Sequence, residues 1–174
     1  MPELIVPTAS MHSAWLEAHT EWGPGLHEDG FGLTPSDEVD SAPGFAAWVA
    51  RLVAQADPAW ATDVGKVPCR YRWIVESERV LGGIALRHGD SDYVRWAGHI
   101  GYGIRPSARR RGLATWAMGR MLSDARDLGL ARVLAVCAVD NAASAKTIER
   151  CGAVFEGIGD TTFGPVRRYW IDLS

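Results

Sequence analysis

The sequence predicts a single α/β domain in which helices flank a mixed β-sheet. Between residues 99 and 150 the pattern alternates strand, helix, strand and helix, which is typical of α/β folds. Strand patterns that can pair as hairpins lie on both sides of that segment. The chain has 174 residues, of which 47% are hydrophobic and 22% are charged, and this is sufficient for one hydrophobic core.

The N-terminal part combines a short strand, a helix and a long polar segment. Glu3–Val6 is an apolar run typical of an edge strand, and Ser10 is placed to cap a helix that begins at Met11 and ends at Trp22. The segment Leu26–Pro43 is rich in Gly, Asp, Ser and Pro and predicts a long loop. Loops of this length are often functional, so it either covers a substrate pocket or is a surface excursion.

A second helix and a hairpin follow. Apolar side chains recur at helical spacing over Ala42–Ala56, and Asp57-Pro58 is expected to end that helix. The strands Pro68–Glu76 and Arg79–His88 are separated by only two residues, which predicts a tight hairpin turn. The pair Gly82-Gly83 within the second strand indicates a bulge or the close approach of another group.

The most informative stretch follows the polar connection Gly89–Gly98. Residues 100–104 alternate large apolar side chains with glycine, which predicts a strand. Pro106 ends this strand because proline cannot donate a ladder hydrogen bond. From Leu113 onward the apolar positions have helical spacing, and Gly129 stands where a helix C-terminal glycine belongs.

A second strand and helix repeat this arrangement. Arg132–Val139 is almost wholly apolar, as in a strand covered on both faces, and Asp140-Asn141 begins a helix over Ala142–Arg150. Val154–Gly157 and Arg167–Leu173 are the last predicted strands. The sequence contains no internal repeat or low-complexity segment that would change this reading.

The turn before the central helix carries three consecutive arginines, Arg109 to Arg111, followed by Gly112. Glycine lets a ligand approach the unpaired N–H groups of the first helical turn, and the helix dipole adds partial positive charge there. The pattern therefore predicts a phosphate or pyrophosphate site at the helix N-terminus. A solvated basic turn is the alternative.

Composition excludes several classes of protein. The 18 basic and 21 acidic residues give a net charge of −3, which argues against a general nucleic-acid binder. Cys69, Cys137 and Cys151 lack metal-ligand spacing and cannot all pair, which fits a reduced setting. No positively charged N-terminal region precedes a hydrophobic segment, and no apolar run has the length of a membrane span. We therefore expect a cytoplasmic protein that does not associate with membranes.

Two motifs resemble the GNAT superfamily of acyl-CoA-dependent N-acetyltransferases. Arg109-x-x-Gly112-x-Ala114 matches its Arg/Gln-x-x-Gly-x-Gly/Ala signature and lies between a strand and an amphipathic helix. Asn141-x-x-Ser144, followed by Gly152 and Phe155, is similar to the second half of the GNAT core. The resemblance covers roughly Val67 to Leu173, and residues 1–66 match only loosely.

The resemblance implies a GNAT-like, mostly antiparallel central sheet within one domain, residues 1–174. Its core, residues 67–173, would bind the cofactor, and the variable residues 1–66 would supply an acceptor-site loop. The implied activity is transfer of an acetyl group from acetyl-CoA to a primary amine by direct attack in a ternary complex. The amine would belong to a small molecule or a peptide. Dimerisation is common among members of the family, so a homodimer is a further expectation.

The resemblance also implies which residues bind the cofactor. Backbone groups of Tyr102 and Ile104 would pair with the pantetheine arm, and the side chains of Asn141 and Ser144 would make a second contact. Asn141 is alternatively a helix cap, and Ser144 a surface hydroxyl. The pyrophosphate would lie at the helix mouth, which consists of Arg109, Arg110, Arg111, Gly112, Leu113, Ala114 and Thr115.

The catalytic residues depart from the family pattern. Many members have a tyrosine seven residues after the asparagine as the general acid, but this position is Ile148 here. Tyr169 on the last strand is a substitute, with an ordinary packed tyrosine as the alternative. His99 is a candidate general base at the start of the central strand, as is His88, because histidine titrates near neutral pH. Either one is alternatively a hydrogen-bonded structural residue.

Three acidic residues and one histidine near the start of the long loop suggest a site for a cationic amine. They are Glu21, His27, Glu28 and Asp29, with a solvated rim as the alternative. Two other functions compete with catalysis. The first is a non-catalytic acyl-CoA-binding sensor on the same fold, because the expected tyrosine and strand carboxylate are missing. The second is a nucleic-acid-binding module using Arg105 to Arg111, which the negative net charge disfavours.

Overall fold

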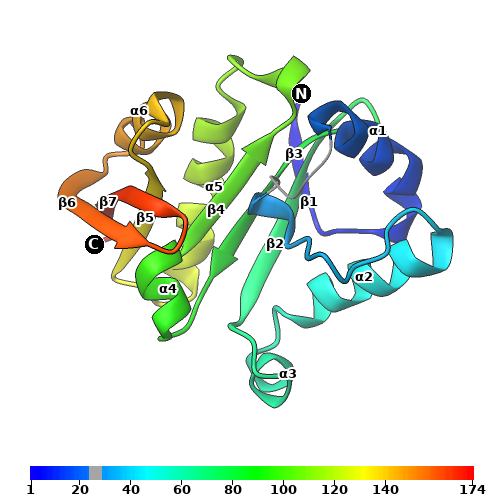
Figure 1. The fold of residues 1–174 in the computed structure, drawn as a ribbon, viewed down its shortest axis with the longest axis horizontal. Coiled ribbons are helices and arrows are strands. Elements are labelled where there is room, and N and C mark those ends of the chain that lie inside the picture. The colour runs from blue at the N-terminus through cyan, green and yellow to red at the C-terminus, as the bar shows by residue number, and fades with distance from the viewer. Residues whose placement is uncertain (24–28) are drawn as a thin grey trace.

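The computed structural model describes residues 1–23 and 29–174 (Figure 1). Its strands are β1 (Glu3–Ile5), β2 (Cys69–Glu76), β3 (Arg79–Arg87), β4 (Ile100–Ile104), β5 (Arg132–Ala138), β6 (Val154–Thr161) and β7 (Gly164–Asp172). Its α-helices are α1 (His12–Trp22), α2 (Ala42–Ala54), α3 (Pro58–Asp63), α4 (Asp92–Ala97), α5 (Leu113–Asp127) and α6 (Ala142–Arg150). Short 3-10 turns are η1 (Ala9–Met11), η2 (Asp29–Phe31) and η3 (Pro106–Ala108).

The strands form one seven-stranded sheet with the order β1-β2-β3-β4-β5-β7-β6. Neighbouring strands are antiparallel except for β4 and β5, which are parallel. This confirms the predicted mixed, mostly antiparallel sheet flanked by helices. A parallel pair needs a crossover connection, and here α5 provides it.

Two hydrophobic cores cover the two faces of the sheet (Figure 1). Side chains of α5 and α6, such as Met118 and Ile148, pack against one face. On the other face, α1, α2 and η2 form a core rich in aromatic rings. In that core Trp15 lies 4.7 Å from Trp48 between ring centroids, and Phe31 lies 6.4 Å from Trp73.

Several boundaries differ from the sequence prediction. Thr8, not Ser10, caps the N-terminal helical segment, because η1 precedes α1 and the Thr8 hydroxyl accepts from the Ser10 N–H. Asp57 does not merely end α2, since its carboxylate accepts from the Ala59 N–H and caps α3. The connection predicted as irregular between residues 89 and 98 contains α4, which Ser91 caps. Helices of six residues are too short to show a clear apolar period.

The last two strands are longer than predicted. The sequence gives Val154–Gly157 and Arg167–Leu173, whereas β6 reaches Thr161 and β7 begins at Gly164. Polar residues interrupt the apolar pattern there, but the ladder continues through pairs such as Asp160 with Pro165. Backbone pairing in a hairpin therefore extends these strands beyond what side-chain alternation indicates.

The predicted close approach at Gly82-Gly83 is confirmed. A Cβ atom at Gly83 would lie 2.8 Å from the ring of Phe31, which is closer than carbon atoms pack. Glycine therefore lets η2 rest directly on β3, and this contact positions residues 32–34 over the sheet.

His99 joins three strands at the point from which β4 and β5 separate. Its N–H donates to Leu134 O over 2.8 Å, and its Nδ1 accepts from the Leu134 N–H over 2.9 Å. Its carbonyl accepts from the Arg87 N–H over 2.6 Å. Within the described residues the β4–β5 ladder consists of the single pair Ile100 and Ala135, so the two strands diverge beyond it.

This hydrogen bond determines which protonation state of His99 the fold tolerates. Burial and, second, the charge of Arg87 lower the pKa of His99. The unfolded chain binds a proton at this residue as the pH falls through about 6.5, whereas the folded chain resists until a lower pH. The stability that neutral His99 contributes is therefore complete above about pH 6.5, and it is lost as the pH falls from there toward the lower pKa of the folded state.

We predict that His99→Asn flattens the pH dependence of stability, because an amide oxygen can accept from the Leu134 N–H without titrating. Denaturant unfolding between pH 7.5 and 5 measures this; each such histidine contributes a slope of at most about 1.4 kcal/mol per pH unit. His88, whose pKa burial also lowers, should account for the slope that remains. A variant with the wild-type slope would contradict this assignment.

Candidate active site

The divergence of β4 from β5 exposes one edge of β4. The Arg87 N–H donates to His99 O and the Arg105 N–H donates to Leu81 O. With this register, the backbone groups of the odd-numbered residues of β4 form the hydrogen bonds to β3. Antiparallel pairing alternates, and the backbone groups of Tyr102 and Ile104 therefore point toward β5. They have the direction that an added, hydrogen-bonded chain needs.

The N-terminus of α5 presents a row of backbone N–H groups. Arg110 and Gly112 have φ angles of 63° and 75°, and two left-handed residues so close together turn the chain sharply into the helix. No described residue accepts a hydrogen bond from the backbone N–H groups of residues 110–115. Because the helix dipole adds positive potential there, the site fits an anion such as a diphosphate.

The three arginines of this turn have different roles. Arg109 folds back, and its Nε donates to Ile104 O over 3.0 Å. Arg111 forms an ion pair with Glu76 at 2.7 Å. Of these three arginines, only Arg110 has a side chain without a hydrogen bond or an ion pair to a described residue. Backbone N–H groups, rather than the full charge of three guanidinium groups, therefore dominate the anion site.

The start of α6 lies beside the gap between the diverging strands β4 and β5, which we call the strand opening. Asn141 caps the helix, because its Oδ1 accepts from the Ser144 N–H over 3.1 Å. The Ser144 and Tyr102 hydroxyl oxygens lie 2.5 Å apart. Ser144 also lies close enough to the Cys137 thiol on β5 to lower its pKa slightly, although burial has the larger, opposite effect. Residues from β4, β5 and α6 thus converge where the strands separate.

Burial controls the protonation of these groups. It raises the pKa of Tyr102 to about 12, so the hydroxyl keeps its proton at neutral pH. It also raises the pKa of the Cys137 thiol, which makes that sulfur a poor nucleophile. The site therefore holds two neutral hydroxyl groups and an un-ionised thiol.

The two catalytic candidates from the sequence are engaged elsewhere. The Tyr169 hydroxyl is buried and donates to Glu149 over 2.9 Å, and burial followed by Glu149 raises its pKa. The Nδ1 of His99 accepts from a backbone N–H, so the neutral ring carries its proton on Nε2 and has no lone pair left for a base. These contacts favour the structural alternative for each residue.

Of the four residues predicted to bind a cationic amine, the structure describes the side chain of Glu21 alone. Glu21 pairs with Arg105, which is only 2% exposed, and accepts from the Ser107 N–H and hydroxyl. Partial burial raises the pKa of Glu21, but the Ser107 and Arg105 contacts outweigh it and leave the pKa lowered. His27, Glu28 and the side chain of Asp29 lie outside the described part.

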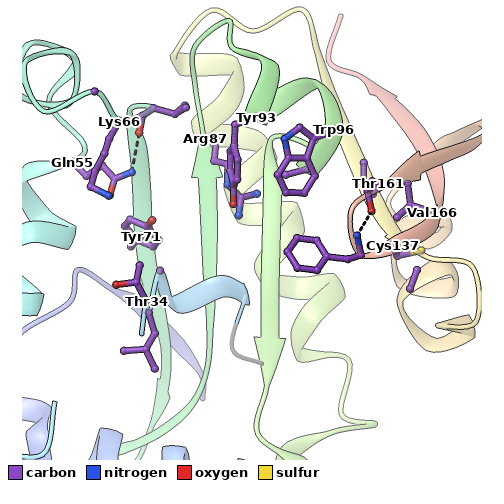
Figure 2. A pocket seen from close by; sticks show the side chains of 18 of the residues that line it. Thr34, Gln55, Lys66, Tyr71, Arg87, Tyr93, Trp96, Cys137, Thr161 and Val166 are labelled. Carbon is purple, nitrogen blue, oxygen red and sulfur yellow. Dashed lines mark hydrogen bonds between the residues drawn. The ribbon is translucent and has the colours of Figure 1, made fainter. Parts of the chain in front are cut away.

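A cavity of about 740 Å³ lies on the face of the sheet that α2 and η2 cover (Figure 2). Gly32, Leu33 and Thr34, in the middle of the predicted long loop Leu26–Pro43, form part of its wall. Cys137 and Ala138 of β5 border it as well, and β5 is one of the two strands that diverge at the opening. Trp96 and Phe163 also line the cavity, and the sequence analysis does not identify them. The sequence signal for them is a large aromatic side chain within an otherwise polar segment.

Two further absences concern the described residues only. They contain no cluster of three metal-ligating side chains. They also contain no helix that is both long and apolar enough to cross a lipid bilayer.

The chain matches known acetyltransferases. A family model described as the GNAT acetyltransferase domain matches residues 6–154. Among solved structures, a ribosomal-protein-S5-alanine acetyltransferase from Vibrio fischeri has 15% identity and a TM-score of 0.74, covering 99% of this chain and 93% of its own. RimL, a ribosomal L7/L12 alpha-N-protein acetyltransferase in complex with coenzyme A, has 17% identity and a TM-score of 0.71, covering 98% and 93%.

A third structure is the microcin C7 self-immunity acetyltransferase MccE in complex with acetyl-CoA and AMP. It has 16% identity and a TM-score of 0.68, and the alignment covers 98% of this chain and 92% of that one. No curated protein matches the sequence significantly. These structural matches establish the fold, and the family model covers most of the chain. The protein therefore belongs to the GNAT acetyltransferase domain family and is an acyl-CoA-dependent acetyltransferase.

Proposed function

We propose that the protein is an N-acetyltransferase that moves an acetyl group from acetyl-CoA to a primary amine within a ternary complex. The observation that carries this proposal is the adjacency of three features: unpaired N–H groups before α5, an open edge on β4, and a cavity across the sheet. The first two suit a long nucleotide-linked thioester, and the third has room for an acceptor. RimL is by name an alpha-N-protein acetyltransferase, which supports an amine as acceptor.

The residues present fit acetyl-CoA. The N–H groups of residues 110–115 would hold its diphosphate, aided by Arg110, and Tyr102 and Ile104 would pair with its pantetheine amides. The amide nitrogen of Asn141 keeps its hydrogens for a further contact, because only the oxygen is used in the cap. When bound, acetyl-CoA supplies an activated thioester carbonyl.

We assign the proton donor for the departing sulfur to the Tyr102–Ser144 hydroxyl pair. Both hydroxyls are protonated at neutral pH and lie beside the strand opening. As the new C–N bond forms and the C–S bond breaks, Ser144 would donate its proton to sulfur and regain one from Tyr102 or water. This pair takes the place of the family tyrosine that Ile148 replaces.

Direct attack by the amine is favoured over an acyl-enzyme. The Cys137 thiol belongs to a residue that borders the cavity, but its raised pKa keeps it protonated. No Asp or Glu is found among the described residues that line the cavity. The amine therefore loses its proton to solvent, and the rate should rise with pH until the amine itself is neutral.

We predict that Ser144→Ala and Tyr102→Phe each lower kcat about 10- to 100-fold with little change in the KM for acetyl-CoA, because each removes a proton donor rather than a binding contact. Thiol release over a panel of amines measures this. Tyr169→Phe is the matched control and should keep kcat within about twofold, since its hydroxyl serves Glu149.

Other outcomes would contradict this assignment. If Tyr169→Phe abolished turnover while Ser144→Ala did not, the acid would be Tyr169. If the protein bound acetyl-CoA but released no thiol with any amine, it would be a sensor rather than an enzyme.

A further inference from the structure

The cavity has two chemically different ends (Figure 2). One end lies between α4, β5 and the turn that joins β6 to β7, next to the strand opening. The other lies between the end of α2 and the segment before β2, around Gln55 and Lys66. A ligand that fills the cavity must therefore satisfy both ends.

Aromatic side chains form the first end. The Tyr93 and Trp96 ring centroids are 5.0 Å apart, and Trp96 lies 6.0 Å from Phe163. Phe163 is 86% exposed at the tip of a turn, where polar residues are usual. A row of exposed aromatic rings on a cavity wall is typical of a surface that binds a planar apolar group.

Polar groups form the second end. Gln55 is only 8% exposed, and its Nε2 donates to Val67 O over 2.9 Å. Its Oε1 is buried and has no hydrogen-bond partner among the described residues, so a ligand or water must supply a donor. Lys66 is exposed beside it and pairs with no described carboxylate.

The charged side chains among the described residues that line the cavity are all basic. Arg51, Lys66 and Arg87 contribute to the described lining, and no acidic side chain does. Arg51 is neutralised by Asp37 at 2.7 Å, and Arg87 is only 7% exposed, which leaves Lys66 as the exposed cation of this lining. A ligand with several positive charges, such as a polyamine, is therefore disfavoured at this end.

We propose that the acceptor is a small aromatic amine that carries an anionic group at the end remote from its amino group. This deepens the proposed function and rests on it. The aromatic body lies against Trp96 and Phe163 with the amino group toward β5, and the anionic end lies near Lys66. The orientation follows because Cys137 and Ala138 of β5 border the cavity, and the thioester is expected where β4 diverges from β5.

Three probes of matched size test this proposal: para-(aminomethyl)benzoate, its saturated cyclohexane analogue, and para-xylylenediamine, in which a second ammonium replaces the carboxylate. Dissociation constants are measured by calorimetry on the full chain with saturating coenzyme A. We expect the aromatic acid to bind at least about threefold more tightly than the cyclohexane acid, and at least about fivefold more tightly than the diamine.

Variants identify the residues responsible. Trp96→Ala and Phe163→Ala should each weaken binding of the aromatic acid by about three- to tenfold and abolish its advantage over the cyclohexane acid. Lys66→Glu should reverse the preference between acid and diamine. Phe155→Ala, an exposed aromatic on the same hairpin but outside the cavity lining, is the control and should change nothing.

Failure of this inference differs from failure of the proposed function. Equal or tighter binding of the diamine, or a ring preference that survives in both aromatic variants, would overturn the inference even if amines are acetylated. The expected order of binding without release of thiol from acetyl-CoA would support the inference and overturn the proposed activity.

Discussion

Unpaired backbone N–H groups at the start of α5 are the feature on which the rest of the site depends. Leu113, Ala114 and Thr115 are buried or half-buried, where an N–H group without an acceptor is costly, and the chain supplies no acceptor from its described residues. The left-handed conformation of Arg110 and Gly112 turns the chain into the helix just before these groups. In the proposed function an anionic ligand supplies the missing acceptor at this turn.

The separation of β4 from β5 gives that ligand a path through the sheet. His99 closes the sheet just before the strands part, and beyond it the β4 edge is open. On one side of this opening lie the hydroxyls of Tyr102 and Ser144, and on the other lies the cavity. In the proposed function, donor and acceptor would approach from opposite faces, as direct transfer requires.

Much of the fold could be predicted because its core elements carry strong local patterns. The glycine-alternating strand β4 and the long amphipathic helix α5 show clear periods, and Gly112 marks the helix start. The helices α3 and α4 escaped prediction because six residues give too little periodicity. The motif around Asn141 and Ser144 predicts a cofactor contact, and this role stays a prediction, whereas the helix-cap alternative for Asn141 is observed.

The catalytic and acceptor sides could not be predicted because they depend on tertiary contacts. The sequence analysis names Tyr169 as the candidate acid and uses only the backbone of Tyr102. Packing shows that Glu149 engages the Tyr169 hydroxyl and Ser144 the Tyr102 hydroxyl. Trp96 and Phe163 are 67 positions apart in the chain and meet only through the β6–β7 hairpin.

Binding of acetyl-CoA to glycine variants of α5, measured by calorimetry, tests the central claim most directly. Gly112→Asp should weaken binding at least about tenfold, because a carboxylate then faces the diphosphate, whereas the left-handed-tolerant Gly112→Asn and the mid-helix control Gly119→Asp should stay within about threefold. Unchanged affinity in Gly112→Asp would contradict the account.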